Sequence, residues 1–399
     1  MSPHLSDLPR LVYIGEVPVR NISAGPALLY RLLESYPQGR LLIAESNDNA
    51  PRPDCELPVP HQRFPLLNRR IMRTRFARAY GAWVFRRAPA HGRRLAARLR
   101  HFQPEAVLGV AHGFGWLAAA AAARTLQVPL HLIVHDHWRS YLSIPPGLNA
   151  AADRLFSATY RGAASRLPVS PEMEALYRER YGAAGVVIYP SRSATAVSLT
   201  APPLRPPQPG AFVFAYAGSA PSVGQRRTLA DFANVTAGLG VRLRIYQSLT
   251  LEELRAVGLR TDNVDIVAFR PVDALHRDLI ESADAMYLPM SFAPEDRDNV
   301  ELCFPSKLTD YTVAGLPILV RAPTYGTATH WAESYPQAAE LITTESETDL
   351  AAKVRRLLED IPHRHALARG ALEVGHRLFA QSSVFQVFSQ AIQKPQNES

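Results

Sequence analysis

The chain has 399 residues, of which 47% are apolar and 20% are charged, which is enough for two domains with their own cores and excludes a disordered chain. Its two cysteines, Cys55 and Cys303, are too few and too far apart to indicate a disulfide framework or a thiolate metal cage. The net charge of +8 is concentrated in residues 63–100, which hold 12 arginines and no acid.

The N-terminus and the apolar segments predict a cytoplasmic protein. Asp7 and two prolines precede the first strand-like run, which differs from the basic and then apolar layout of a signal peptide. The longest apolar stretch, residues 114–123, is followed by Arg124 and is too short to span a membrane. We therefore expect a cytoplasmic location, with peripheral binding to the inner membrane face left open.

Short apolar runs alternate with longer helical patterns in the first half of the chain, which predicts a parallel sheet covered by helices. The expected strands are 11–14, 39–44, 106–110, 130–134 and 186–189, and the expected helices are 26–34 and 115–126. Residues 191–210 then become polar and finally proline-rich. That composition is typical of a linker.

The alternation resumes after the linker. The expected strands are 212–217, 242–246, 264–267, 285–288 and 318–321, and the expected helices are 228–237, 251–257, 273–283, 307–314, 350–360 and a long one over 363–393. We predict two Rossmann-like, doubly wound α/β domains that face each other across a cleft, since ligands bind outside the carboxyl ends of such strands. Residues 1–200 would form the first domain, residues 201–375 the second, and residues 376–399 a helix that crosses back to the first domain.

The arginine-rich segment 63–100 also contains apolar residues such as Phe76 and Trp83. A helix of this composition can lie on an anionic membrane surface or bind an anionic acceptor. A solvated basic face is the plain alternative, and nucleic acid is a third partner that arginines favour. We expect no nucleic-acid partner, but the sequence leaves these alternatives open.

Residues 299–318, which contain Cys-Phe-Pro-Ser-Lys-Leu-Thr-Asp, are the most informative segment. Pro305 and Ser306 suit a helix start, whose N–H groups can bind a phosphate, and Lys307 adds a positive charge there. Asp310 lies three residues further on nearly the same face, where a carboxylate can accept hydrogen bonds from ribose hydroxyls. An ordinary amphipathic helix that ends at Gly315 is the alternative.

The run Pro-Ser-Lys-Leu-Thr-Asp-Tyr followed by Gly-Leu-Pro resembles the donor-binding signature of the retaining family 4 glycosyltransferases of GT-B fold. Other motifs follow in the order of that family, sharply so over residues 212–322. They are a glycine at the first helix, a histidine after a strand, and Tyr-Ala-Gly at the opening of the second domain. The resemblance implies a nucleotide-sugar donor, with residues 201–375 as the donor-binding domain and residues 1–200 as the acceptor-side domain.

The resemblance also implies roles for individual residues. Backbone amides near Gly25 would meet the donor diphosphate, His112 would approach the reactive end of the sugar, and Lys307 with a nearby arginine would stabilise the leaving phosphate. Asp310 would hold the ribose. The remaining donor-binding residues would be Gly218, Ser219, Phe269, Val272, Leu302, Cys303, Phe304 and Ser306.

Two departures from the family pattern concern charged positions. The family places an arginine soon after the glycine that corresponds to Gly218 and a lysine several residues later, whereas this chain has Arg226 and Arg227. We expect Arg226, or its neighbour Arg227, to replace that pair, although both could be helix-surface charges. The acid that the family often has eight positions before Asp310 is Leu302 here.

We expect no metal and no cofactor. His135 and His137 flank Asp136, but no further ligand cluster accompanies them, and the Asp296-Arg-Asp298 pair lies in a charged loop beyond its strand. Cations of the protein would take the place of a metal.

The predicted function is therefore retaining transfer of a sugar from a nucleotide diphosphate sugar to a hydroxyl of a glycan acceptor. The acceptor could be lipid-linked, as in surface polysaccharide or glycoconjugate synthesis. A non-catalytic GT-B-like partner protein and a sugar-nucleotide epimerase are the alternatives. The nucleotide base, the sugar, the acceptor and the oligomeric state are not predicted.

Overall fold

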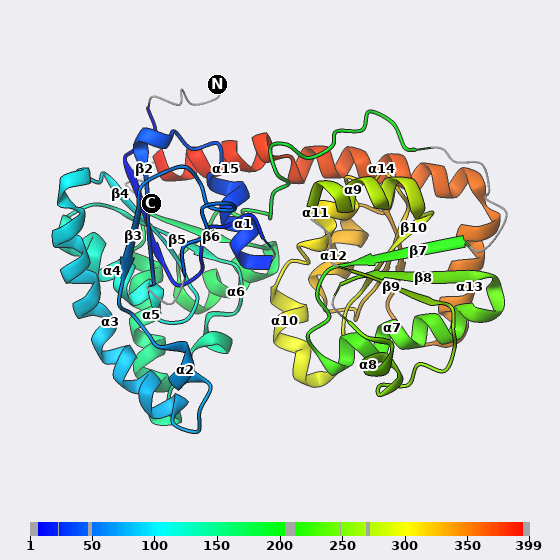
Figure 1. The fold of residues 1–399 in the computed structure, drawn as a ribbon, viewed down its shortest axis with the longest axis horizontal. Coiled ribbons are helices and arrows are strands. Elements are labelled where there is room, and N and C mark those ends of the chain that lie inside the picture. The colour runs from blue at the N-terminus through cyan, green and yellow to red at the C-terminus, as the bar shows by residue number, and fades with distance from the viewer. Residues whose placement is uncertain are drawn as a thin grey trace. The chain divides into compact units, whose positions relative to one another are not determined.

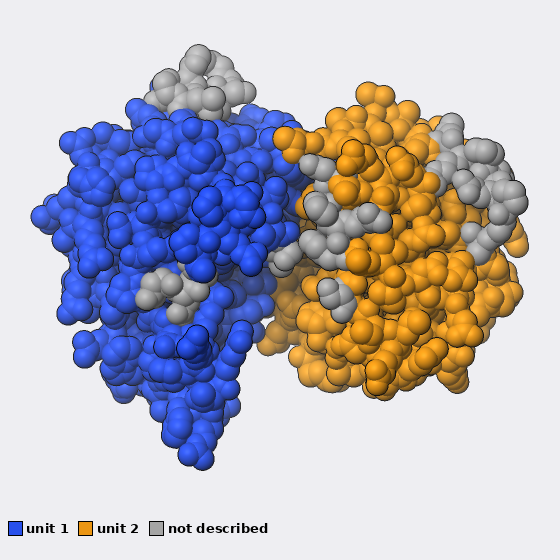
Figure 2. All heavy atoms as spheres, in the orientation of Figure 1, with its two compact units in different colours: residues 1–194, 381–399 blue, residues 195–380 orange. Residues whose placement is uncertain are grey.

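The strands are short, and several of them are continuous apolar runs, as expected for parallel strands that are covered on both faces. All five residues of β1 (Leu11–Gly15), for example, are buried. The computed structural model describes residues 7–22, 24–46, 50–203, 212–247, 249–268 and 272–393. They fold into two units, residues 1–194 with 381–399 and residues 195–380, coloured separately in Figure 2.

Unit 1 is built on a six-stranded sheet in the order β3-β2-β1-β4-β5-β6, in which every pairing is parallel. Its strands are β1, β2 (Leu41–Ser46), β3 (His61–Phe64), β4 (Ala106–Val110), β5 (Leu130–Val134) and β6 (Ser165–Pro168). Its helices are α1 (Ala24–Leu33), α2 (Arg69–Met72), α3 (Ala77–Leu99), α4 (Gly115–Leu126), α5 (Asn149–Gly162), α6 (Pro171–Tyr181) and α15 (Gln381–Gln393). Figure 1 shows the helices flanking the sheet.

Unit 2 repeats this plan with the order β12-β11-β10-β7-β8-β9, again with parallel pairings only. Its strands are β7 (Phe212–Ala217), β8 (Val241–Tyr246), β9 (Val264–Val267), β10 (Ala285–Pro289), β11 (Ile318–Arg321) and β12 (Ala339–Ile342). Its helices are α7 (Val223–Thr236), α8 (Leu251–Arg255), α9 (Val272–Ser282), α10 (Arg297–Leu302), α11 (Lys307–Tyr311), α12 (Thr327–Ser334), α13 (Glu347–Glu359) and α14 (Ile361–Phe379).

Both sheets reverse their strand order once, between β1 and β4 in unit 1 and between β7 and β10 in unit 2. In doubly wound sheets, ligands bind outside the carboxyl ends of the strands at such a reversal. The residues that follow these four strands are therefore the first places to look for chemistry. They are Glu16, His112, Gly218 and Ser291 with their neighbours.

The C-terminal segment is two helices rather than the single one expected over residues 363–393. The backbone leaves the helical conformation at Ala380, with φ −57° and ψ 137°, which separates α14 from α15. The second helix packs against α1 and adds Val384, Phe388 and Ile392 to the core cluster of unit 1, which also contains residues of β1 and β2. The described residues 7–194 and 381–393 thus belong to one unit although unit 2 separates them in the sequence.

The unit boundaries lie a few residues from the expected positions of 200/201 and 375/376. Residues 195–203 lie with unit 2, where His376 Nε2 on α14 is 3.0 Å from the carbonyl oxygen of Leu199. Since α14 continues to Phe379, its last turn also stays in unit 2.

Three strands were not predicted, and one predicted strand is absent. Strands β3, β6 and β12 are four residues long and carry polar or charged residues, so their sequences lack a clear strand pattern. Residues 186–189 are not a strand, although the N–H of Val186 donates to the carbonyl of Arg166 in β6 at 2.8 Å. Gly185 and Pro190 bound this segment and limit its pairing.

We predict that α15 stabilises unit 1 although it lies last in the sequence. Replacing the fully buried Phe388 by alanine should cost roughly 3–5 kcal/mol, because the lost ring leaves a cavity. Hydrogen exchange should then accelerate in β1 and β2. The exposed Gln386→Ala on the same helix is the control. Equal acceleration in β7 and β8, or none in β1, would contradict this role.

Candidate functional site

Lys307 lies at the carboxyl end of β7, where the strand order of unit 2 reverses. An ideal Cβ on Gly218 would approach the Lys307 Cε to 2.7 Å, so the lysine stem passes directly over this glycine. The ammonium Nζ lies 5.5 Å from the centre of the Tyr216 ring, within the range of a cation–π contact. The Tyr216 hydroxyl in turn donates to the Ser219 carbonyl at 2.6 Å and fixes the turn after β7.

The charge of Lys307 is held in a poorly solvated place. Burial lowers the pKa of Lys307 to about 8, and no carboxylate among the described residues offsets this by pairing with it. A buried cation without an anion is stabilised when an anionic ligand arrives. The surroundings of Lys307 therefore favour a negatively charged ligand at this end of β7.

Asp310 lies one turn after Lys307, and its carboxylate is held from a neighbouring helix. His276 Nε2 of α9 is 3.1 Å from Asp310 Oδ1, and the Asp310 side chain remains 23% exposed. Next to it, the Tyr311 hydroxyl accepts from the Ala217 N–H at 3.0 Å and donates to the Ala217 carbonyl at 3.3 Å. These bonds tie α11 to the end of β7, so Lys307 and Asp310 keep a fixed relation to Gly218.

The helix that begins at Lys307 is shorter than the expected 307–314. It ends at Tyr311 and continues in turns up to Gly315. Thr309 and Thr312 contribute to this, because their hydroxyls donate back to the carbonyls of Ser306 and Leu308 at 2.7 Å. A helix of five residues has only a weak dipole, so the anion-binding character of this loop depends on the Lys307 charge.

The loop before α11 is held to unit 2 through its own backbone. The Cys303 N–H donates to the Asn299 carbonyl at 3.0 Å, and Thr327 Oγ1 donates to the Cys303 carbonyl at 2.8 Å. The Phe304 ring packs 5.6 Å from that of Phe379. The Cys303 amide, which we expected to face the donor, is thus already bonded within the chain.

The other expected donor residues lie at several places. Val272 is the first residue of α9, Ser306 precedes α11, and Leu302 ends α10. Gly25 lies in the first turn of α1 in unit 1, and Ser219 is exposed after β7. Phe269 is outside the described residues.

Arg226, the expected substitute for the missing cation pair, lies in the first half of α7. Its Nη1 is 3.6 Å from Glu253 Oε1 on α8, and the two side chains are 24% and 45% exposed. Its charge is therefore already paired. Arg227, the second candidate, lies near Asp231. Burial raises the pKa of the Asp231 carboxyl, and the charges of Arg321 and Arg227 offset only part of that rise.

His112 of unit 1 follows β4 at the reversal of the first sheet. Its ring lies 4.2 Å from that of Tyr141, which is 45% exposed, and its Nδ1 is 3.8 Å from Asp136 Oδ2. Three groups from the loops after β4 and β5 thus meet at one sheet edge. An exposed aromatic ring beside polar groups is suited to a polar organic ligand.

Glu16, which the sequence reasoning did not single out, lies beside this group directly after β1. It accepts hydrogen bonds from the N–H groups of Phe114 and Gly115 at the start of α4. Burial raises the pKa of Glu16 to about 7, although those bonds and the charges of His112 and Arg69 lower it. The signal that could have revealed it is an acid directly after an apolar first strand.

The histidines around Asp136 have separate environments. Burial lowers the pKa of His135 to about 4, while His137 Nδ1 lies 3.3 Å from the Tyr177 hydroxyl. In the described part of the chain, no three histidine, cysteine or carboxylate side chains cluster as metal ligands.

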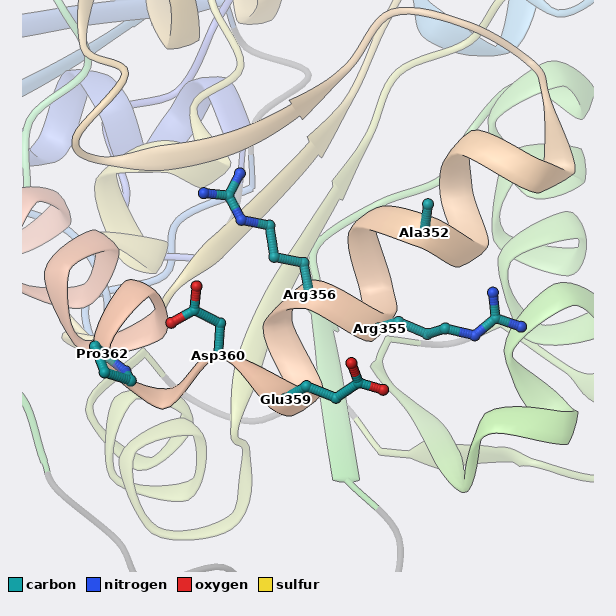
Figure 3. A pocket seen from close by; sticks show the side chains of 6 residues that line it. All are labelled: Ala352, Arg355, Arg356, Glu359, Asp360 and Pro362. Carbon is teal, nitrogen blue, oxygen red and sulfur yellow. The ribbon is translucent and has the colours of Figure 1, made fainter.

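A surface hollow in unit 2 lies apart from these groups. Figure 3 shows that helices α13 and α14 line it, with the residues Ala352, Arg355, Arg356, Glu359, Asp360 and Pro362. Asp360 is used to cap α14, because its Oδ1 accepts from the His363 N–H at 2.9 Å. None of these residues directly follows a strand.

The arginine-rich segment forms α2, α3 and the turns around them, where α2 lies in a protruding part of unit 1 (Figures 1 and 2). We call its exposed arginines the arginine surface: Arg69, Arg70, Arg73, Arg75, Arg78, Arg86, Arg87, Arg93, Arg94, Arg98 and Arg100. Phe76 and Trp83 are 58% and 46% exposed among them. No helix in the described ranges is long and apolar enough to cross a bilayer.

Comparisons with known proteins agree with this architecture. Residues 44–191 match the family model of Glycosyltransferase Family 4. Anabaena HepE (Alr3699), solved in complex with UDP and glucose, superposes with a TM-score of 0.67 and 14% identity over 97% of this chain and 100% of that one. The protein has the GT-B fold of family 4-like glycosyltransferases.

Other structures share this GT-B fold. Sucrose-phosphate synthase from Thermosynechococcus elongatus has a TM-score of 0.66 and 14% identity, over 95% of this chain and 97% of that one. The lipopolysaccharide outer core galactosyltransferase WaaB has a TM-score of 0.61 and 14% identity, over 96% and 98%. A search of curated proteins found no match.

We predict that Gly218 is required for the site. Its φ of 127° is unfavourable for other residues, and a side chain would collide with the Lys307 stem. Gly218→Ala should destabilise unit 2 by roughly 1–3 kcal/mol, as measured by denaturant unfolding. Gly238→Ala is the control, because no atom lies within 4 Å of its added Cβ. If Gly218→Ala and Gly238→Ala lower the free energy of unfolding equally, the close packing of Lys307 against Gly218 is contradicted.

Glu16 should make stability depend on pH. Because its pKa is raised from 4.5 to about 7 in the folded protein, ionisation penalises the folded state increasingly as pH rises through that window. Glu16→Gln removes the penalty. The difference in melting temperature between this variant and the wild type should therefore increase in favour of the variant from pH 4.5 to pH 7 and remain constant above pH 7. Glu179→Gln, an exposed change on α6, is the control. A difference independent of pH would contradict the burial of this carboxylate.

Proposed function

We propose that the protein is a retaining glycosyltransferase that moves a hexosyl group from a nucleoside diphosphate sugar to a hydroxyl group of a glycan acceptor. The observation that carries the proposal is the position of Lys307, a poorly solvated cation over Gly218 at the sheet reversal of unit 2. This is the place where a doubly wound sheet binds the phosphates of a nucleotide.

In the proposed step, the bond between the anomeric carbon and the diphosphate oxygen breaks, and the acceptor oxygen bonds to that carbon on the same face. The acceptor proton passes to the leaving diphosphate. Negative charge develops on the diphosphate as it departs, and Lys307 would stabilise this charge without first being reorganised. Retention is proposed from the resemblance to family 4, and no metal is needed where protein cations neutralise the charge.

Asp310 and the first unit would supply the remaining contacts. The partly exposed Asp310 carboxylate would accept hydrogen bonds from ribose hydroxyls. His112, with Tyr141 and Asp136 beside it, would face the sugar and the acceptor. The structures of HepE with UDP and with UDP-glucose support a nucleotide-sugar donor by analogy of fold.

One observation favours a second function, that of a non-catalytic GT-B-like partner protein. The cation pair that the family usually places after Gly218 is missing, and Arg226 is paired with Glu253. Such a protein would bind a nucleotide sugar without turnover. A sugar-nucleotide epimerase would instead convert the free nucleotide sugar without any acceptor.

A panel of UDP, GDP, dTDP and their common sugars tests the donor site by thermal shift. We expect one nucleotide to raise the melting temperature, because a ligand that binds only the native state stabilises it. Lys307→Ala should weaken binding at least about 10-fold, which corresponds to ~1.4 kcal/mol. The surface variant Arg255→Ala, which removes an exposed charge in the same unit, should bind as the wild type does.

The outcomes separate the alternatives. If no nucleotide raises the melting temperature, or if Lys307→Ala leaves that increase unchanged, the proposed donor site is wrong. Release of nucleoside diphosphate only when an acceptor is present would support a transferase. Binding without any turnover would support the partner protein, and isomerisation of the free donor would support the epimerase.

We further propose that the arginine surface rests on an anionic membrane at the inner face, where a lipid-linked acceptor in polysaccharide or glycoconjugate synthesis would be presented. Arg75 lies over the exposed Phe76 ring at 4.9 Å, and Arg87 lies over the exposed Trp83 ring at 5.3 Å. Arginine beside exposed aromatic rings suits the interfacial region of a bilayer, where charge and apolar surface are both satisfied.

Sedimentation with vesicles of phosphatidylcholine and phosphatidylglycerol tests this surface. The double variant Arg70→Ala with Arg73→Ala should bind roughly 30-fold more weakly, since each basic residue near such a surface contributes about 1 kcal/mol. The control is Arg154→Ala with Arg161→Ala, which removes two exposed arginines of α5. Equal losses in the two double variants, or stronger binding to duplex DNA than to the vesicles, would contradict the proposal.

A further inference from the structure

His276 is a fully buried histidine whose described contact is with the residue expected to hold the ribose. It lies in the middle of α9, which runs beside α11 in unit 2 (Figure 1). Its side chain is 1% exposed, while that of Asp310 is 23% exposed. The histidine is therefore enclosed, and the carboxylate that it contacts reaches the surface.

The chemistry of the pair fixes which atom carries the proton. An ionised carboxylate only accepts hydrogen bonds, so His276 Nε2 must be the donor in the 3.1 Å contact with Asp310 Oδ1. The other ring nitrogen, Nδ1, is buried and has no hydrogen-bond partner in the part of the chain that the structure describes. The imidazole thus directs its one satisfied nitrogen at Asp310.

A buried polar contact of this kind is not explained by stability alone. Enclosing an imidazole with one unsatisfied nitrogen costs free energy that an apolar side chain of similar size would avoid. What the contact does provide is orientation, because it fixes the rotation of a carboxylate that is otherwise partly solvated. Fixed carboxylates are required where a ligand diol must be held in one geometry.

We propose that His276 is a positioning residue that orients Asp310 toward the ribose hydroxyls of the nucleotide donor. This inference rests on the proposed function, and it extends that function to a residue outside the sequence motif. His276 lies 31 positions or more before every residue of α11, so the motif itself gives no indication of it. Two helices would then contribute to ribose binding: α9 would orient the Asp310 carboxylate through His276, and α11 would supply the oxygen that accepts the hydrogen bond.

The test compares nucleotides with and without a 2′-hydroxyl. Dissociation constants for UDP and 2′-deoxy-UDP, and for GDP and 2′-deoxy-GDP, are measured by calorimetry on the wild type, Asp310→Asn, His276→Leu and His276→Gln. We expect the wild type to prefer the ribonucleotide by about 10-fold, as for a hydrogen bond to a charged group. His276→Leu should bring the ratio close to one, whereas His276→Gln, which retains an N–H donor, should restore part of it.

The ratio separates positioning from a general loss of structure, because a damaged fold weakens both nucleotides alike. A wild-type preference that His276→Leu leaves unchanged would overturn the inference and leave the donor site standing. A preference that Asp310→Asn leaves unchanged would also overturn it, because Asp310 would then not bind the ribose hydroxyls. If the wild type binds none of these four nucleotides and does not bind dTDP either, the proposed function itself fails.

Discussion

The site of this protein depends on one constraint, a lysine ammonium held where it is poorly solvated and has no carboxylate partner among the described residues. Gly218 makes this possible, because only the absence of a side chain lets the Lys307 stem cross the end of β7. The surrounding bonds from Tyr216 to Ser219 and from Tyr311 to Ala217 keep that crossing in place. The chain thus maintains an unneutralised charge at the strand-order reversal of unit 2, the place where doubly wound sheets bind their ligands.

The two units apply the same topology to different chemistry. In unit 1, the residues after β1 and β4 are Glu16 and His112, an acid and an imidazole near an exposed tyrosine. In unit 2, the residues after β7 and around α11 are a cation and an oriented carboxylate. The first set suits hydroxyl groups and the second suits a nucleoside diphosphate.

Much of the fold was predictable because buried parallel strands are continuous apolar runs. Residues 106–110, 130–134 and 212–217 were placed to the residue, and the family match and the structural neighbours confirm the GT-B fold. Strands such as Ser165–Pro168 were missed because polar residues interrupt them. Glu16 and His276 were not predicted, because their importance comes from contacts between residues that are distant in sequence. Glu16 contacts Phe114 and His276 contacts Asp310, and no local spacing indicates either pair. The roles of the motif residues remain predictions.

The most direct test of the central claim is the titration of Lys307 itself. The chain contains only three lysines, so selective ¹³C labelling of the lysine side chains gives a spectrum in which Lys307→Arg identifies one signal. We predict that this signal titrates near the lowered pKa of about 8 in the free protein and that the pKa of Lys307 rises when the nucleoside diphosphate binds. A signal that titrates near the ordinary lysine pKa of 10.5, unchanged by nucleotide, would contradict the account.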